Sequence, residues 1–172
     1  MKRCFSFVAS IACMGFVTAC SAKMALAADE VNFSGKYLAE RKAAPGRSGL
    51  ALEVVQNNDY VEITRMELGK KTTSRCPLNG SEGDYTSLGG ISGKCKAQRK
   101  GKYLIVESVV VTRPQPTTAV RMHTKERWQL STDVKTLTIK SDVDFPDFPA
   151  DISAAVAGNT SGIMKYTRTD FP

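Results

Sequence analysis

Side chains that alternate between apolar and polar along short segments are the strongest constraint on how this chain folds. Within residues 135–145, one face carries Leu137, Ile139, Val143 and Phe145, and threonine, lysine or aspartate stands opposite them. A period of two is typical of a strand with one buried face, whereas a helix repeats every 3.6 residues. The same alternation, interrupted by turn-forming residues, recurs in segments 33–40, 50–56, 60–68, 117–130 and 160–169, whereas 102–113 is apolar on both faces, as expected of a central strand. The chain is therefore predicted to be all-β.

A small protein built from about eight to ten antiparallel strands has to protect the edges of its sheet. An up-and-down barrel does so by closing the sheet on itself, and its interior holds packed side chains or one small ligand. We therefore predict such a barrel. One short helix is expected near the C-terminus, at 151–158, with Asp151 capping its first turn and Gly158 its last.

The first 27 residues are typical of an export signal and not of a folded segment. Lys2 and Arg3 precede an apolar run at 4–19, and small residues follow it. That run is shorter than the roughly 20 residues that span a bilayer, and no later segment approaches this length. We predict a signal peptide at 1–27, a single domain at 28–172 and no transmembrane segment.

Two cleavage sites compete at the end of this signal. Residues 17–20, V-T-A-C, read as a lipobox that would make Cys20 a lipid-modified N-terminus on an outer-membrane lipoprotein. Ala25 and Ala27 instead match the small-residue pattern of an ordinary signal peptidase. The alanine pattern favours cleavage after Ala27 and a periplasmic or secreted protein. Membrane contact is expected only if Cys20 is lipidated.

Two cysteines, Cys76 and Cys95, remain outside the signal. Thiols of exported proteins usually pair, so a structural disulfide is favoured over a metal pair or a redox pair. No C-x-x-C motif occurs, and His123 is the only histidine of the chain, which argues against a metal site or a redox centre. We expect no metal and no cofactor.

The charge of the domain is mildly positive. Three of the 24 basic residues and none of the 17 acidic residues lie in the first 27, so the remainder carries a net charge of +4. Strand 117–130 places Arg121, His123, Lys125 and Arg127 on one face. This basic stripe could meet lipid phosphates, but a solvated outer face is the commoner reason for such a pattern. No nucleic-acid partner is expected, because the chain lacks an exposed aromatic series.

Several segments resemble small exported bacterial β-barrels of lipocalin-like (calycin-type) build. These segments are the opening F-S-G-K-Y, the hairpin LEVVQNNDYVEITR, the hairpin ERWQLSTDVKTLTIKS and the closing MKYTRTD, which together span 33–169. Tyr37 stands where the pattern of that family has tryptophan. The resemblance implies a barrel and an apolar ligand in its mouth or lumen. It implies no catalytic residues.

Candidate ligand contacts lie on the two central strands: Tyr103, Ile105, Met122, Glu126 and Trp128. Glu126 falls on the apolar side of its strand beside Trp128, and a carboxylate buried alone is costly. Glu126 could therefore pair with an inward arginine or bind a ligand, or a register shift could turn it outward. A single carboxylate without a second acid or histidine in register makes no general acid/base site.

The aspartates 142, 144, 147 and 151 supply oxygen ligands of the kind that Ca²⁺ prefers, but prolines stiffen this run and turn formation also explains it. We predict a binding protein for a small apolar or amphipathic ligand and not an enzyme. The alternative is an envelope interaction or inhibitor module that presents loop 77–94 and whose lumen is filled with side chains.

Overall fold

The computed structural model describes residues 31–40, 50–67, 69–87, 89–115 and 118–170. Ten strands and one helix follow one another in the order β1 (Gly35–Ala39), β2 (Ala51–Gln56), β3 (Tyr60–Glu67), β4 (Lys70–Pro77), β5 (Gly83–Thr86), β6 (Ser92–Lys100), β7 (Tyr103–Gln115), β8 (Thr118–Leu130), β9 (Thr136–Asp144), α1 (Ala150–Thr160) and β10 (Gly162–Arg168). The predicted signal segment and Cys20 lie outside the described residues.

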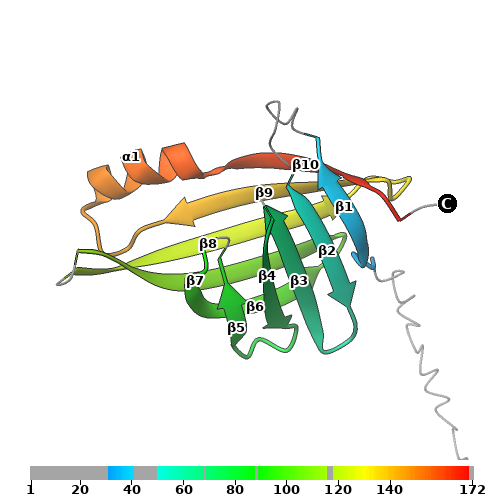
Figure 1. Ribbon diagram of the computed structural model, residues 1–172, viewed down its shortest axis with the longest axis horizontal. Coiled ribbons are helices and arrows are strands. Elements are labelled where there is room, and N and C mark those ends of the chain that lie inside the picture. The colour runs from blue at the N-terminus through cyan, green and yellow to red at the C-terminus, as the bar shows by residue number, and fades with distance from the viewer. Residues whose placement is uncertain (1–30, 41–49, 68, 88, 116–117, 171–172) are drawn as a thin grey trace, which may run out of the picture.

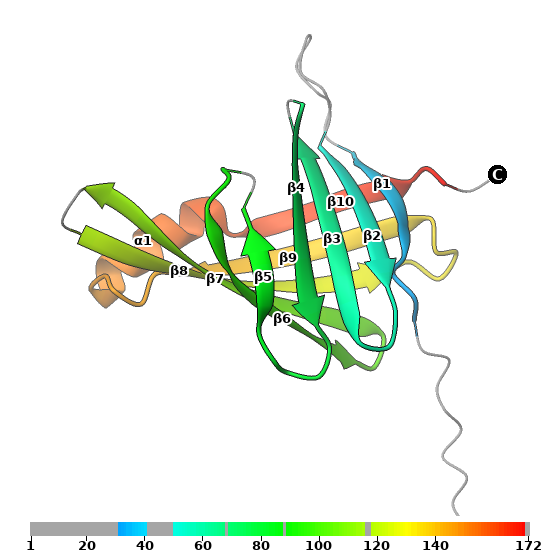
Figure 2. The same ribbon diagram turned by 60° about the horizontal axis from the view of Figure 1, so that its bottom comes forward.

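One antiparallel sheet contains all ten strands, and almost every strand pairs with its neighbours in sequence. There are two exceptions: β1 also pairs with β10, which brings the two ends of the domain together, and β4 and β5 do not pair with each other. The resulting order is β4-β3-β2-β1-β10-β9-β8-β7-β6-β5. The walls β1–β4 and β6–β10 face each other and cross at a steep angle (Figure 2). The fold is thus a nearly closed up-and-down barrel, which confirms the predicted all-β architecture.

The barrel closes between β4 and β5 without a backbone ladder, and we call this junction the seam. The Ser74 hydroxyl accepts a hydrogen bond from the Thr86 N–H at 3.0 Å and donates one to the Thr86 carbonyl at 3.3 Å. The disulfide Cys76–Cys95 joins β4 to β6 across the short strand β5. Gly83 fits here because a Cβ at that position would lie 2.0 Å from the Arg75 carbonyl oxygen. Side chains and one covalent bond therefore hold the seam shut, and the predicted disulfide is confirmed.

The interior of the barrel is built by the side chains that alternate inward from every strand. Large fully buried members include Trp128, Tyr37, Phe33, Leu104 and Leu137. Burial of such side chains contributes roughly 1.5–3 kcal/mol each relative to exposure. Since they pack together at one end, that end of the lumen is filled with side chains and excludes water.

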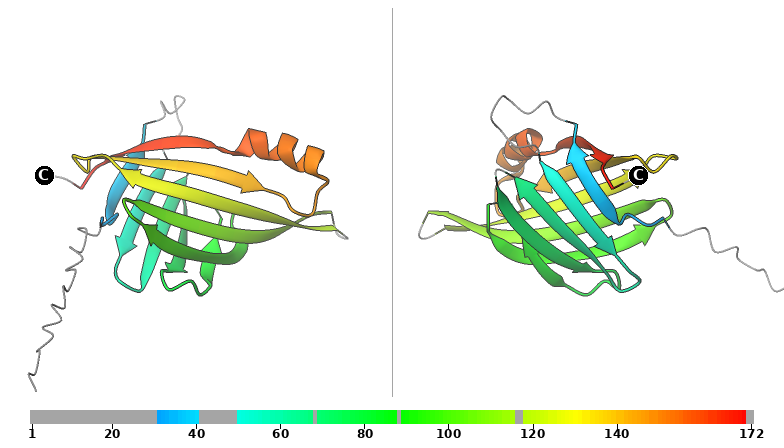
Figure 3. Two further views of the ribbon diagram at one scale, coloured as in Figure 1. Left: turned by 180° about the vertical axis from the view of Figure 1, so that it is seen from behind. Right: turned by 45° about the vertical axis from the view of Figure 1, so that its right-hand side comes forward.

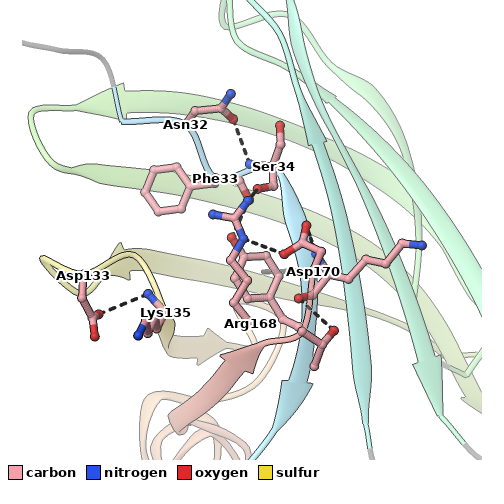
Figure 4. A network of polar contacts seen from close by, with 10 residues as sticks. Asn32, Phe33, Ser34, Asp133, Lys135, Arg168 and Asp170 are labelled. Carbon is pink, nitrogen blue, oxygen red and sulfur yellow. Dashed lines mark hydrogen bonds and ion pairs between the residues drawn. The ribbon is translucent and has the colours of Figure 1, made fainter. Parts of the chain in front are cut away.

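Arg168 fastens this filled end (Figure 4). Its guanidinium lies over the ring of Tyr37 at 5.8 Å and donates hydrogen bonds to the Ser34 carbonyl and to Asp170. The Tyr37 hydroxyl donates to the Phe33 carbonyl at 2.9 Å. Burial raises the pKa of Tyr37 to about 12 although the charge of Arg168 opposes the shift. The contact ties the first strand to the last, on the ladder that joins the two ends of the domain.

Helix α1 and the extended β7–β8 hairpin lie at the same end of the molecule (Figures 1 and 3). Two serines attach the helix to β9: Ser153 accepts the Phe145 N–H and donates to Asp144, and Ser161 accepts the Val143 N–H. Within the described residues, no helix is long and apolar enough to cross a membrane.

The predicted helix exists, but the predicted caps are wrong. The helix begins at Ala150 after Pro149, no side chain caps it, and it continues past Gly158 to Thr160. The Pro149 carbonyl accepts the Ser153 N–H and starts the helical hydrogen bonds. Asp151 lies in the first turn instead, where a carboxylate interacts favourably with the helix dipole.

Replacing Gly35 by alanine should destabilise the protein. Gly35 has a φ of +153°, and a Cβ there would lie 2.7 Å from Arg168 Nε. We expect the free energy of unfolding to fall by about 1–3 kcal/mol, as measured by urea unfolding. Gly158→Ala is the matched control: it sits in α1 with nothing within 4 Å, and should stabilise by about 0.5–1 kcal/mol. Equal effects of the two changes would contradict the role of Gly35.

Removing the disulfide should loosen the seam. The bridge closes a loop of sequence separation 19, so the double variant Cys76→Ser/Cys95→Ser should lose about 3 kcal/mol of unfolding free energy. Guanidinium unfolding of the variant and of the parent protein measures the difference. An unchanged midpoint would show that the side-chain hydrogen bonds alone keep β4 against β5.

Candidate functional site

Three of the predicted ligand contacts share the inward face of β8. Trp128 is 0% exposed, and Met122 and Glu126 are half-buried on the same side of the strand. The residues between them point outward, as the alternation in the sequence predicts: Arg121, His123, Lys125 and Arg127. Met122, Glu126 and Trp128 therefore form a row that runs from the filled end of the lumen towards the opposite end.

The structure places Tyr103 and Ile105 on the other face of the wall. They alternate along β7 with Leu104 and Val106, which are 0% and 2% exposed and point into the core. Arg127 lies over the outward ring of Tyr103 at 5.4 Å. Because β7 is apolar on both faces, the sequence alone did not show which set points inward. Tyr103 and Ile105 are accordingly separated from the other three residues.

An ion pair crosses the interior from β3 to β8. Arg65 Nη2 donates to both carboxylate oxygens of Glu126, at 2.9 and 2.8 Å, and the Trp128 Nε1–H donates to the same carboxylate at 2.9 Å. The two charged side chains are only 10% and 15% exposed. The expected inward arginine partner of Glu126 is thus Arg65, and no register shift turns the carboxylate outward.

The electrostatics favour a charged Arg65 despite its burial. Burial by itself would lower the pKa of Arg65, but the adjacent carboxylate of Glu126, with smaller contributions from Tyr85 and Tyr166, raises it above its ordinary value. The guanidinium of Arg65 therefore keeps its positive charge inside the barrel.

Two polar atoms beside this ion pair have no partner. Arg65 Nη1 and Thr72 Oγ1 are both buried and form no hydrogen bond. Their residues are cross-strand neighbours on β3 and β4, so their side chains project from adjacent positions on the inner wall. Buried polar groups are hydrogen-bonded in the large majority of proteins, and an unpartnered pair is a candidate contact for a bound molecule.

On the other side of the ion pair, the inward-facing Ser108 and Val110 of β7 are buried, whereas inward-facing side chains of β8 and β9 remain half-buried. We call the half-buried side chains the mouth residues: Met122, Thr124, Ser141 and Val143, together with Met164 of β10, which packs against the core beside Ile139. They lie on β8, β9 and β10 towards the end where α1 is found. The interior thus has a packed apolar end, a buried ion pair, and beyond it an inner surface that solvent reaches in part, along β8 and β9.

The alternation of side chains along β3 also predicts that Arg65 points inward. Strand β3 places Val61, Ile63 and Arg65 at successive inward positions, all between 0% and 8% exposed. Because Arg65 follows two buried aliphatic residues at a spacing of two, its side chain is expected to point into the barrel. It is therefore a predictable partner for the inward carboxylate of Glu126. Thr72 and Met164 carried no comparable signal, because their meeting with the other residues depends on how the barrel closes.

The structure offers no metal site in the part of the chain that it describes, where no three carboxylate, histidine or cysteine side chains cluster. Three of the four aspartates considered for calcium have protein partners instead, and one of these is Asp142, which contacts Lys140 at 3.5 Å. Asp147 accepts hydrogen bonds from the guanidinium and the backbone N–H of Arg121, and these contacts lower the pKa of Asp147 to about 2. Asp144 accepts the Ser153 hydroxyl.

Comparison with known proteins identifies the fold. No protein family and no curated protein sequence matches the chain. Among solved structures, it is similar to a fatty acid transporter designated REP1-NXSQ, with a TM-score of 0.53 at 14% identity over 81% of this chain and 97% of the other. It is also similar to the zebrafish ileal bile acid-binding protein in complex with cholic acid, with a TM-score of 0.51 at 16% identity over 80% and 98%.

The chain has a lipocalin-like (calycin-type) barrel fold. This confirms the fold implied by the sequence resemblance, and the low identities carry the likeness no further than the fold. The first of these proteins is named as a fatty acid transporter and the second as a bile acid-binding protein.

Breaking the ion pair should be more damaging than removing it. Glu126→Ala leaves the charge of Arg65 buried without a partner, and we expect a loss of about 3 kcal/mol in unfolding free energy. The double variant Arg65→Met/Glu126→Leu removes both charges and should recover most of that loss. Thermal unfolding of the three proteins decides the point. A double variant as unstable as the single one would show that the ion pair itself stabilises the barrel.

Proposed function

We propose that this protein binds a small amphipathic molecule inside the barrel, with the polar end of the molecule at Arg65 and its apolar part along the mouth residues. The observation that carries this proposal is the unpartnered guanidinium nitrogen of Arg65 at the boundary between the packed core and the half-open inner surface. A ligand oxygen would satisfy that nitrogen, and binding sites typically combine apolar walls with a few such polar groups.

The polar end of the ligand is best matched by a carboxylate. Arg65 already gives one side of its guanidinium to Glu126, so Nη1 remains for a second acceptor. Charge-assisted hydrogen bonds to arginine are about twice as strong as neutral ones. The fatty-acid and bile-acid associations of the two similar folds agree with an acidic lipid, although they describe those proteins.

Access to this position requires side chains to move. Both unpartnered atoms are shielded from solvent, and the surrounding mouth includes Met122 and Met164. Methionine side chains are unbranched and flexible, so they can make way for a ligand and pack against it afterwards. The filled end around Trp128 would stay intact and act as a rigid floor.

The setting proposed for this activity is the cell envelope. The charged start, apolar run and alanine pattern of residues 1–27 support export to the periplasm or out of the cell, and lipidation at Cys20 would place the protein on the outer membrane instead. We further propose that the protein carries its ligand and catalyses no reaction. Mass spectrometry of the mature N-terminus distinguishes cleavage after Ala27 from acylation of Cys20.

Fluorescence of Trp128 tests the proposal directly, because it is the only tryptophan and its indole N–H contacts Glu126. Palmitate should change the emission saturably, and palmitic acid methyl ester should bind more weakly because it lacks the charge. Arg65→Met should raise the dissociation constant of palmitate about tenfold or more, while Arg65→Lys should restore part of the affinity.

Arg127→Met is the matched control, since Arg127 lies on the outer face of the same strand as Glu126. It should leave palmitate binding unchanged. An emission that does not respond to palmitate, its ester or any other apolar probe would contradict the proposal and favour an interaction module with a filled lumen.

A further inference from the structure

The outer face of strands β6–β9 contains a groove of about 480 Å³, separate from the barrel interior. We call it the outer groove. Cavities of this volume are in the range of small-ligand sites. Its lining comes from outward-facing side chains of four neighbouring strands, so it points away from Arg65 and the mouth residues. It therefore requires an occupant different from the ligand of the lumen.

Two rows of cross-strand neighbours flank the groove. One row runs Lys94, Val109, His123, Asp144, and the other runs Lys96, Glu107, Lys125, Asp142, each from β6 to β9. The row between them, which includes Cys95 and Thr124, points into the barrel and leaves only backbone on this side. The groove thus crosses the strands between two rows of side chains.

The groove has two lysines at one end and two aspartates at the other. At the β6 end, Lys94 and Lys96 stand on either side of it, and at the β9 end Asp142 and Asp144 do the same. Three strand spacings separate the ends, which is about 14 Å. Between the ends, Lys125 and Lys96 neutralise Glu107 at 2.9 and 3.3 Å, and this contact, led by Lys125, lowers the pKa of Glu107.

Existing ion pairs at the ends are exposed and exchangeable. Lys94 contacts Asp84 at 3.0 Å and Asp142 contacts Lys140 at 3.5 Å, and their side chains are 45% to 93% exposed. Exposed pairs of this kind contribute little, so a ligand charge can replace one partner at low cost. Two acids, Glu82 and Asp84, lie near the lysines of the β6 end, and Lys96 also contacts Glu107 at 3.3 Å. A ligand carboxylate at this end takes the place of these exposed partners.

We propose that the outer groove binds a short free peptide in extended conformation, with its terminal carboxylate between Lys94 and Lys96 and its terminal ammonium between Asp142 and Asp144. About four residues match the length, because an extended chain advances 3.3–3.6 Å per residue. Val109 and the aliphatic parts of the lysines contact the middle of the peptide, where a neutral side chain fits best.

His123 reports on this site, because it is the only histidine of the chain and lies in the wall of the groove. We would follow its ring signals by NMR while adding tetra-alanine to the full protein. We expect a saturable shift at millimolar peptide. N-acetyl tetra-alanine and tetra-alanine amide each lack one terminal charge and should bind about three- to tenfold more weakly. Di-alanine is too short to reach both ends and should also bind weakly.

Two double variants identify which end of the groove binds the carboxylate of the peptide and which end binds its ammonium group. Lys94→Gln/Lys96→Gln should abolish the preference for the free carboxylate and keep the preference for the free ammonium. Asp142→Asn/Asp144→Asn should do the reverse. Lys70→Gln/Lys71→Gln is the matched control, since both lysines are exposed on β4 away from the groove, and it should keep both preferences.

Four results would overturn the proposal, and three of them concern peptide binding. They are equal affinity for the free and capped peptides, unchanged preferences in the groove variants, and His123 signals that do not respond to tetra-alanine. Signals that instead move with protein concentration in the absence of peptide would also overturn it, because a second copy of the chain would then occupy the face. None of these outcomes bears on palmitate binding in the lumen. The peptide proposal and the palmitate proposal are therefore tested independently.

Discussion

The pairing of β1 with β10 is the constraint on which the rest of this structure depends. It joins the two ends of the domain and turns a ten-stranded sheet into a barrel with an inside and an outside. Once the sheet is closed, each alternating side chain is assigned to the lumen or to the surface. Arg168 reinforces the junction by lying over Tyr37 and bonding to Ser34, so the first and last strands are held by both backbone and side chains.

Closure is less complete on the opposite side of the barrel, near the proposed ligand site. At the seam, β4 and β5 are joined by the Ser74–Thr86 hydrogen bonds and by the disulfide instead of a ladder. Thr72 lies on β4 beyond the Ser74–Thr86 contact, and its unpartnered hydroxyl is next to Arg65. The part of the barrel with incomplete polar pairing is therefore also the part with the least regular backbone support. Such local irregularity is expected where a fold retains a site for binding.

The same wall of strands carries both proposed sites, one on each face. Its inner face carries Trp128, Glu126 and the mouth residues, and its outer face carries the ordered lysines and aspartates of the outer groove. A strand can do this because successive side chains point to opposite faces, so the two sites share backbone and no side chain faces both. Lumen and groove can consequently change independently in sequence.

How much the sequence could predict differs between these features. Alternation along β8 and β9 was sufficient for the strands, for the inward positions of Glu126 and Trp128, and for the outward basic stripe, because a period of two depends only on neighbours in the chain. On β7, both faces are apolar, so Tyr103 and Ile105 could not be distinguished from Leu104 and Val106 before the neighbouring strands were placed. The caps of α1 were mispredicted because Pro149 and the bonds to β9 set where it begins.

The sequence by itself determined the strand content, the antiparallel barrel and the pairing of Cys76 with Cys95, since these follow from local periodicity and from the small number of thiols. Only the tertiary structure decided that Arg65 is the partner of Glu126, that Thr72 stands beside it, and that two lysines and two aspartates flank one groove. The partners in each set come from strands far apart in the chain or in different registers. Sheet closure and strand register fix those distances, and neither can be read from neighbouring residues.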